Sequence, residues 1–413
     1  MNEPASNDYD LIIVGAGMVG ATLACALGGQ GFRIALVEAR QPEFDWPADS
    51  VDQRVSAITC ASQKIFESIG AWSVMSGQRV SPYREMRVWD ATGTGAIHFD
   101  SAELGEPLLG HIVENRVTLF ALHKCLKSLE TVSLLAPSSV TKLEIDSDKA
   151  QVELDDGRFL SASLVVAADG SRSKVRELAG IETTGWSYHQ HGVVAHIVTS
   201  QDNQETAWQR FMPDGPLAFL PLSDGSSSIV WSTTPEHAET LLAMNETEFL
   251  DELQQAFGDR LGRMIKCGPR AAFPLHLQHA KTYTQPRIAL LGDAAHTVHP
   301  LAGQGVNLGL ADAASLAEVI VDARKQQQDI GRHKVLRRYE RWRKGENLTM
   351  LSTMDGFKRL FGSTKPVMKW LRNTGLRLTN STTPIKNLIM RQAMGMEGDL
   401  SRLARGQALD GEQ

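Results

Sequence analysis

The sequence predicts an α/β fold in which a parallel sheet is interrupted by an inserted antiparallel sheet and followed by a helical C-terminal region. Three observations favour this class. Short apolar runs that end beside a glycine have the form of buried parallel strands, and they occur at 11–14, 164–169 and 287–293. Alternating segments bounded by glycine turns are typical of antiparallel strands, and they occur at 86–99, 192–199, 207–212 and 217–233. After Gly305 the pattern turns helical.

The composition is that of an ordinary globular chain. Its 413 residues are 42% hydrophobic and 22% charged, which predicts two or three domains with a sizeable core. The net charge of −6 argues against nucleic acid as a partner. The four cysteines form no C-x-x-C pair. We therefore expect neither a disulfide framework nor a zinc site, and a reducing cytoplasm fits.

The uncharged segment 11–32 resembles a membrane span or a signal segment at first sight. No lysine or arginine precedes it, and glycines at a functional spacing interrupt it. We interpret it as the start of the fold. No other stretch is long and apolar enough to cross a bilayer, which predicts a soluble or peripheral protein.

The first candidate site is the motif Gly15-Ala-Gly17-Met-Val-Gly20, which follows a strand and opens a helix predicted over 18–28. Gly15 permits the tight turn, Gly17 lets a pyrophosphate approach the backbone, and Gly20 lets the helix pack closely on the strand. Glu38 ends the next strand, 33–38, where an acid can hydrogen-bond the adenosine ribose. This Rossmann-like βαβ unit predicts binding of FAD or NAD.

Two further elements each combine aspartate and glycine. Asp169-Gly170 follows the second buried strand, and its alternative interpretation is a helix start capped by Ser171 or Ser173. Gly292-Asp293 follows the third strand, where the aspartate can accept hydrogen bonds from the ribityl hydroxyls of a flavin. The glycine-rich run after it opens a helix whose N-terminus can stabilise negative charge on a reduced flavin. Alone, it is equally an ordinary strand–loop–helix junction.

Taken in this order, the three elements resemble the flavin-dependent aromatic hydroxylases of the para-hydroxybenzoate hydroxylase type. Five further segments are similar to the ubiquinone-biosynthesis branch of that family: Arg54–Ile58, Gly110–Asn115, Ala218–Leu222, Gly292–Gly309 and Arg391–Gly395. The likeness covers nearly the whole chain.

The resemblance implies a discontinuous FAD-binding domain, 1–78, 111–184 and 284–345, with a substrate domain at 79–110 and 185–283 and a helical region at 346–413. It implies FAD contacts from Gly15, Gly17, Gly20, Glu38, Arg54, Arg116, Asp169, Gly170, Gly292, Asp293, Pro300, Gly303, Gly305 and Asn307. No acid–base dyad stands out. The candidates for catalysis are His296, which packing explains equally well, and Pro300.

The activity implied by the resemblance is that of an FAD-dependent monooxygenase. NAD(P)H reduces the flavin, and a flavin C4a-hydroperoxide hydroxylates the ring of a polyprenylated phenol or quinol in ubiquinone biosynthesis, with a preference for C5. Two alternatives stay open. One is a flavin-dependent quinone or prenyl reductase that does not oxygenate. The other is a non-catalytic FAD-binding scaffold of a biosynthetic complex, and association with other proteins of the pathway or with further copies of the chain is a related expectation.

The other motifs are less informative. His189 and His191 have no neighbouring ligand, so no metal site is expected, and no G-x-S-x-G supports a hydrolase. We expect Trp208, Trp231 and Phe219 in the core of the inserted sheet, with pocket lining as the alternative.

The C-terminal region has an unusual charge distribution. Residues 356–396 hold eight bases and no acid, with apolar residues between them. This pattern predicts either a helical face packed on the FAD domain or on a subunit, or a peripheral contact with anionic lipid at the inner membrane surface.

Overall fold

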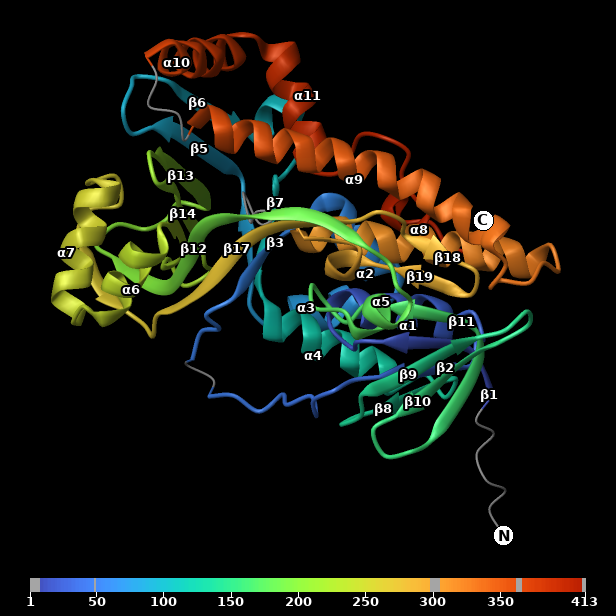
Figure 1. The fold of residues 1–413 in the computed structure, drawn as a ribbon. Helices are drawn as coiled ribbons and strands as arrows, with labels where there is room; N and C mark the ends of the chain where they lie inside the picture. Colours follow the sequence, from blue (N-terminus) through green and yellow to red (C-terminus); the bar gives the residue numbers. More distant parts are fainter. Residues whose placement is uncertain (1–7, 48–49, 298–304, 362–365, 411–413) are drawn as a thin grey trace.

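The computed structural model describes residues 8–47, 50–297, 305–361 and 366–410. Figure 1 shows two halves, each built around a sheet. One half holds β1, β2, β11 and α1, and the other holds β12 to β15 with α6 and α7. The long helix α9 (His333–Phe361) runs along both halves.

The first sheet contains the three buried strands that the sequence predicts. Its order is β18 (Thr284–Gln285), β19 (Ile288–Leu290), β11 (Phe159–Ala167), β1 (Asp8–Val14), β2 (Ile34–Val37) and β8 (Val132–Leu135). The strands from β19 to β8 are parallel. An antiparallel extension, β9 (Val140–Ile145) and β10 (Ala150–Leu154), continues from β11. The prediction of one parallel sheet from distant segments is therefore confirmed.

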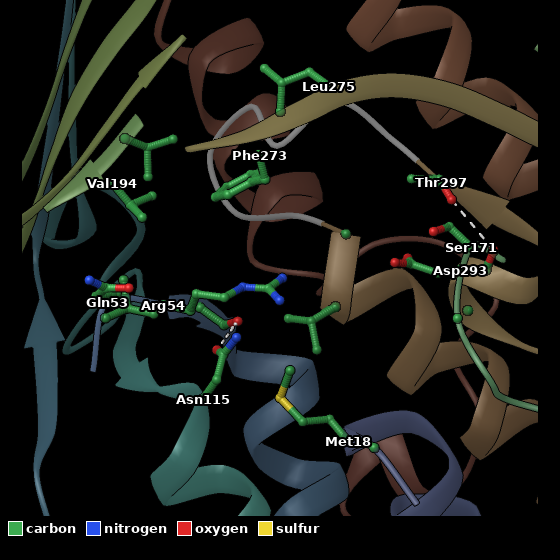
Figure 2. A pocket seen from close by; sticks show the side chains of 18 of the residues that line it. Met18, Gln53, Arg54, Asn115, Ser171, Val194, Phe273, Leu275, Asp293 and Thr297 are labelled. Carbon is green, nitrogen blue, oxygen red and sulfur yellow. Dashed lines mark hydrogen bonds between the residues drawn. The ribbon is translucent and has the colours of Figure 1, made fainter. Parts of the chain in front are cut away.

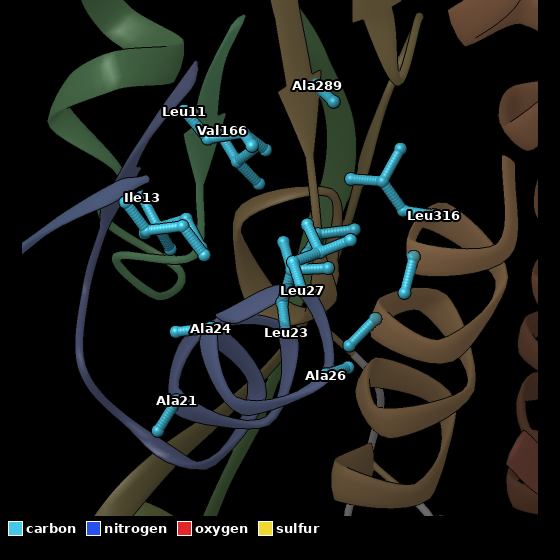
Figure 3. Packing of buried hydrophobic residues seen from close by; sticks show 14 of the residues in the cluster. Leu11, Ile13, Ala21, Leu23, Ala24, Ala26, Leu27, Val166, Ala289 and Leu316 are labelled. Atoms are coloured by element: carbon cyan, nitrogen blue, oxygen red, sulfur yellow. The ribbon is translucent and has the colours of Figure 1, made fainter. Parts of the chain in front are cut away.

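Helices cover the parallel sheet because its strands are apolar on both faces. Helix α1 (Met18–Gly28) lies beside α8 (Gly305–Lys325) and α4 (Asn115–Leu126). Leu11 of β1, Val166 of β11, Leu23 and Leu27 of α1 and Leu316 of α8 point into one fully buried core (Figure 3). This core fixes the carboxyl ends of β1, β11 and β19 beside one another.

The second sheet has the order β20 (His296–Thr297), β17 (Ala271–Ala280), β12 (Thr183–Thr199), β15 (Ser227–Thr233), β14 (Gly215–Pro221), β13 (Thr206–Met212), β5 (Glu85–Asp90) and β6 (Ala96–Asp100). Strand β16 (Met264–Cys267) pairs with β12. The predicted antiparallel arrangement holds except at one position, where β13 and β5 are parallel. The exception arises because the β5–β6 hairpin comes from a separate, earlier segment and joins the sheet at its edge.

The predicted aromatic core of this sheet is confirmed. Trp208, Phe219 and Trp231 are buried against α6 (Pro235–Ala243) and α7 (Glu246–Phe257). The alternative, in which they line a pocket, is wrong for a geometric reason. Neighbouring residues of a strand point to opposite faces, and these three point to the face that the helices cover.

A third sheet joins the two halves. Strand β7 (Gly110–Glu114) lies between β3 (Val55–Thr59) and β4 (Val80–Tyr83), and both pairs are antiparallel. Short helices follow β3 and β6, namely α2 (Cys60–Ser68), α3 (Ala71–Ser76) and η1 (Ser101–Leu104). Two of the segments that resemble the ubiquinone branch are therefore paired strands, β3 and β7.

Helices α10 (Pro366–Ser381) and α11 (Thr383–Ala393) follow α9, and η4 (Leu403–Arg405) packs beside α2.

We keep the division into domains as a proposal. Three of its boundaries, 110/111, 184/185 and 345/346, fall inside β7, β12 and α9. Among the described helices, none is both long and apolar enough to cross a membrane.

Candidate flavin and substrate cavity

A cavity of about 630 Å³ lies between the parallel sheet and the second sheet. One wall is formed by the loops at the carboxyl ends of β1, β11 and β19, which is where open α/β sheets bind ligands. Of the predicted contacts, six line it: Gly17, Arg54, Gly170, Gly292, Asp293 and Gly305. Figure 2 shows Arg54, Met18 and Asp293 converging on this space.

The three motif glycines have different surroundings. A Cβ on Gly15 would lie 2.3 Å from the carbonyl oxygen of Ala168, and Gly15 has φ +102°, so only glycine fits its turn. A Cβ on Gly20 would lie 1.9 Å from the carbonyl oxygen of Gly15. A Cβ on Gly17, the N-cap of α1, would meet no atom within 4 Å. Gly15 and Gly20 therefore hold the turn together, and Gly17 faces the open space that a pyrophosphate needs.

Glu38 lies beside the glycine turn, immediately after β2. Its Oε2 accepts a hydrogen bond of 2.8 Å from the Ala16 N–H, and its Oε1 accepts one of 3.2 Å from the Arg40 N–H. The half-buried carboxylate thus lies where the ribose of a dinucleotide would bind. This position fits the adenosine part of FAD.

The Asp169–Gly170 motif performs the capping role that its alternative interpretation predicts. Asp169 Oδ2 accepts hydrogen bonds from the N–H groups of Lys174, at 2.7 Å, and Val175, at 3.2 Å. Ser173 caps the same short helix, α5 (Lys174–Leu178). Asp169 Oδ1 is buried and has no partner among the described residues. Only Gly170 of this motif lines the cavity, at φ +82°.

Asp293 is the only carboxylate among the cavity-lining residues of the described chain. Its side chain points into the cavity and is accessible from that space, and protein atoms surround it on its other sides. Burial raises the pKa of this carboxyl above its ordinary value, and the nearby His296 and Arg54 oppose that effect. A hydroxyl-rich ligand would supply the hydrogen bonds that a carboxylate in such a position lacks.

We expect Asp293→Asn to weaken FAD binding by roughly ten- to hundredfold, because charge-assisted hydrogen bonds are worth about 1.5–3 kcal/mol each. The same variant should leave the apoprotein as stable as wild type or more stable near neutral pH. Because the pKa of Asp293 is raised in the folded protein, ionisation of this carboxyl lowers the free energy of unfolding as the pH rises through the folded pKa. Asparagine does not ionise and therefore avoids this loss. Flavin titration and urea unfolding of the apoprotein measure the two effects, and an unchanged FAD dissociation constant would remove Asp293 from the site.

Arg54, Arg116 and Asn307 differ in what they contact. Arg54 extends into the cavity, with its guanidinium carbon 5.7 Å from the centre of the Phe273 ring. Arg116 lies outside the lining and is held by Glu114 and Ser50.

Asn307 is buried on α8. It accepts a hydrogen bond from the Thr59 N–H at 3.1 Å and donates one to the Ala57 carbonyl oxygen at 2.7 Å. It thereby joins α8 to β3.

His296 is not among the cavity-lining residues. Its side chain is buried, and Nε2 lies 2.5 Å from Oδ2 of Asp312 on α8. Asp312 Oδ1 accepts hydrogen bonds from Arg343 Nε at 2.9 Å and from Asn347 Nδ2 at 3.1 Å, both on α9. Despite its burial, these partners hold the Asp312 pKa at about 2. The other catalytic candidate, Pro300, lies outside the described residues, as does Gly303.

Asp312 also binds the flavin motif directly. Its Oδ2 accepts a hydrogen bond of 3.2 Å from the Gly292 N–H. Gly292 begins η2 (Gly292–Ala294), which carries Asp293. Sequence analysis missed this carboxylate, because nothing in the spacing of Asp312 and Arg343 distinguishes a buried ion pair from a solvated one. We infer that the buried network positions the loop that carries Asp293.

The opposite wall of the cavity is the uncovered face of the second sheet. Its apolar members are Val194, Ala218, Leu220, Val230, Phe273 and Leu275. Several alternate along β14 and β15 with the buried aromatic residues. Sequence analysis did not identify them, although period-2 alternation gave the signal: if Phe219 and Trp231 face the helices, then 218, 220 and 230 must face the other way.

One group of possible metal ligands lies outside this cavity. Glu85, His98 and Asp100 place ligand atoms within 4.8 Å of one another on the β5–β6 hairpin. Glu85 is already paired with His98, at 2.7 Å, and with Arg87, at 3.0 Å. Asp100 accepts a hydrogen bond from the Ala102 N–H, so each of the three side chains already has a partner within the protein.

The comparisons with known proteins agree with this geometry. A family model described as an FAD binding domain matches residues 8–346. The 3-demethoxyubiquinol 3-hydroxylase of Escherichia coli (strain K12) is 39% identical over 388 residues, covering 94% of this chain and 98% of that protein. The ubiquinone biosynthesis monooxygenase COQ6, mitochondrial, of Xenopus tropicalis is 39% identical, with 92% of each chain covered.

A solved structure shows the same fold. The crystal structure of the p-nitrophenol 4-monooxygenase PnpA from Pseudomonas putida DLL-E4 matches with a TM-score of 0.77, covering 94% of this chain and 98% of that one. The sequence identity is 20%, so this likeness concerns the fold alone.

Proposed function

We propose that this chain, which belongs to the FAD-binding family of ubiquinone-biosynthesis hydroxylases, uses NAD(P)H and dioxygen to hydroxylate a polyprenylated phenol or quinol. As a member of that family it is an FAD-dependent monooxygenase of ubiquinone biosynthesis. The observation that carries the finer proposal is the arrangement of the cavity. Its parallel-sheet wall presents Gly17, Gly170 and Asp293, and its other wall is the apolar face of the second sheet.

The residues of the first wall, together with Glu38 beside the glycine turn, fit FAD. Gly17 and the N-terminus of α1 would receive the pyrophosphate, Glu38 the adenosine ribose and Asp293 the ribityl chain. Arg54 would lie near the isoalloxazine, inside the cavity. When bound, reduced FAD supplies the capacity to activate dioxygen. The protein would position the flavin and the substrate, exclude water from the cavity and provide the electrostatic environment.

The second wall fits the ring of an apolar phenol. Leu220, Val230 and Phe273 offer hydrophobic contact, whereas Gln209, Ser228 and Ser232 offer a few hydrogen-bonding groups on the same face. A small number of polar groups in a mostly apolar wall is what orients a ligand of this kind. The wall carries no acid among the described residues, so the ring is expected to bind without a charged partner there.

We place the protein in the cytoplasm at the inner membrane surface, where such a substrate dissolves. Association with other proteins of the pathway or with a second copy of the chain is part of the same proposal.

Removal of the protein from its host is expected to cause a polyprenylated intermediate to accumulate. This intermediate should lack one ring hydroxyl, because the chain's reaction would be blocked while earlier steps continue. Mass spectrometry of the quinone pool measures it, and NMR of the intermediate should place the missing hydroxyl at C5. If the intermediate instead has all its ring oxygens but a ring or prenyl chain that has not been reduced, the result would favour the alternative of a flavin-dependent quinone or prenyl reductase. Restoration by a variant that cannot bind FAD would favour the scaffold.

A further inference from the structure

Three polar side chains of the helix pair α10–α11, Arg372, Asn373 and Lys386, contact acidic residues of the protein. Arg372 Nε lies 2.7 Å from Asp90 Oδ2, and both side chains are buried. Asn373 donates a hydrogen bond of 3.1 Å to the same oxygen. On α11, the buried Lys386 Nζ lies 2.6 Å from Glu103 Oε2. The inward face of this pair is therefore held by ion pairs to β5 and η1.

This arrangement corrects one part of the sequence-based prediction. Of the eight bases in 356–396, Arg372 and Lys386 face Asp90 and Glu103 and are not available to lipid. Arg359 is paired with Asp355. Lys369 and Arg391 are exposed. The sequence could not distinguish the two groups, because the acidic partners come from segments nearly three hundred residues earlier.

The outward face of the same helices is apolar. Val367 is 68% exposed, Trp370 64%, Leu378 60%, Leu388 56% and Ile385 51%. With Met368 and Ile389 they make up seven of the fourteen exposed large hydrophobic side chains among the described residues. We call these seven residues the outer face. A concentration of this kind marks an interaction site, because monomeric proteins rarely expose contiguous apolar surface.

We propose that the outer face is a membrane-docking surface that inserts its apolar side chains into the interface of an anionic lipid bilayer. The proposal rests on the proposed function, since a polyprenylated substrate must be collected from lipid. Residues 356–396 carry no acid, whereas the rest of the chain is strongly acidic, and the exposed Lys369 and Arg391 lie on the same two helices, so this face suits an anionic surface. Tryptophan together with apolar residues on one side of surface helices is typical of interfacial binding.

A second cavity, of about 270 Å³, lies between this region and the first cavity. It shares Pro216 with the first cavity and has a mixed lining, in which Phe211 and Met212 occur together with polar residues such as His189, Gln190 and Asp214. Phe361, the last residue of α9, also lines it and stacks on Phe211 with ring centres 3.9 Å apart. The apolar part of this space, Phe211 and Phe361, packs against Leu376 of α10, so a lipophilic chain leaving the first cavity would find apolar contacts on the side where the C-terminal helices attach.

Liposome flotation of the FAD-bound protein tests the proposal. The vesicles contain phosphatidylcholine alone or with phosphatidylglycerol. We compare wild type with the triple variant Trp370→Ser, Leu378→Ser and Leu388→Ser. The matched control is Phe159→Ser with Ile265→Ser, which removes exposed apolar side chains elsewhere. Wild type and control should float with anionic vesicles, and the triple variant should bind at least tenfold more weakly, roughly the loss expected for one buried large apolar group. Raised salt should weaken wild-type binding only in part.

The outcomes separate docking from catalysis. Retained flavin and an unchanged unfolding midpoint show that the triple variant is folded. Equal flotation of wild type and triple variant, or no flotation of wild type at low salt, overturns the proposal. So does a wild-type dimer that the triple variant converts to a monomer in light scattering, because the face would then be a subunit interface. Normal docking by a protein that hydroxylates no phenol would instead contradict the proposed function and leave the docking surface intact.

Discussion

Replacement of Asp312 by asparagine is expected to lower the free energy of unfolding by about 3–5 kcal/mol, the usual cost of breaking a buried ion pair from one side. Asp312 is fully buried, and its carboxylate accepts hydrogen bonds from Arg343, Asn347 and the Gly292 N–H. Without it, the buried Arg343 guanidinium faces a neutral amide and retains the partly exposed Glu346 as an acidic partner. Urea unfolding of the apoprotein measures the change.

A surface pair provides the control. Asp156 pairs with Arg158 at 2.7 Å, and both side chains are well exposed. Asp156→Asn should therefore leave the urea midpoint close to that of wild type. If the Asp312 and Asp156 variants unfold at the same urea concentration, the buried network contributes no more to the free energy of unfolding than the surface pair does.

The dependence on pH follows from the lowered pKa of Asp312. Its folded pKa is about 2, below the ordinary value of 3.8. A lowered carboxyl pKa contributes stability that is fully present above the unfolded value and is lost as the pH falls through the folded value. Wild type should thus lose this contribution between about pH 4 and pH 2, and Asp312→Asn should not. A shared slope in that window would contradict the assignment.

Gly17→Val is expected to abolish measurable FAD binding while the protein folds. The added side chain meets no protein atom at its Cβ, but it fills the space that the pyrophosphate needs at the start of α1. Loss of two or more charge-assisted hydrogen bonds of about 1.5–3 kcal/mol each predicts an affinity at least roughly a hundredfold lower. Flavin titration with circular dichroism separates binding from folding.

Gly20→Ala is the matched comparison. Its Cβ would lie 1.9 Å from the Gly15 carbonyl oxygen, so this smaller substitution should unfold or displace the turn. We expect the Gly20 variant to lose stability and flavin together. Tight FAD binding by Gly17→Val would mean that the dinucleotide approaches this motif elsewhere.

The parts of the fold that depend on local patterns were predictable. The βαβ unit with Gly15, Gly17, Gly20 and Glu38 was visible because turn, helix and terminal acid lie within thirty residues. The membership of β1, β11 and β19 in one parallel sheet followed from their shared apolar form, and the structure adds that they are neighbours. The cofactor roles of these residues stay predictions, which the variants above test.

What the sequence could not reveal depends on pairs of distant residues. The parallel pairing of β5 with β13, the Asp312–Arg343 pair and the Arg372–Asp90 pair each need the fold before they exist. His296 illustrates the limit. Its position beside the flavin motif suggested chemistry, but the structure gives it a buried structural partner.

We propose that this chain inserts one atom of dioxygen into an aromatic ring. The most direct measurement supplies the purified FAD-bound protein with NAD(P)H, a polyprenylated phenol and ¹⁸O₂, and analyses the product by mass spectrometry. We predict a new ring hydroxyl that carries the label, with oxygen uptake matching its formation. A reduced product with no oxygen uptake, or a hydroxyl whose oxygen comes from water, would contradict the account.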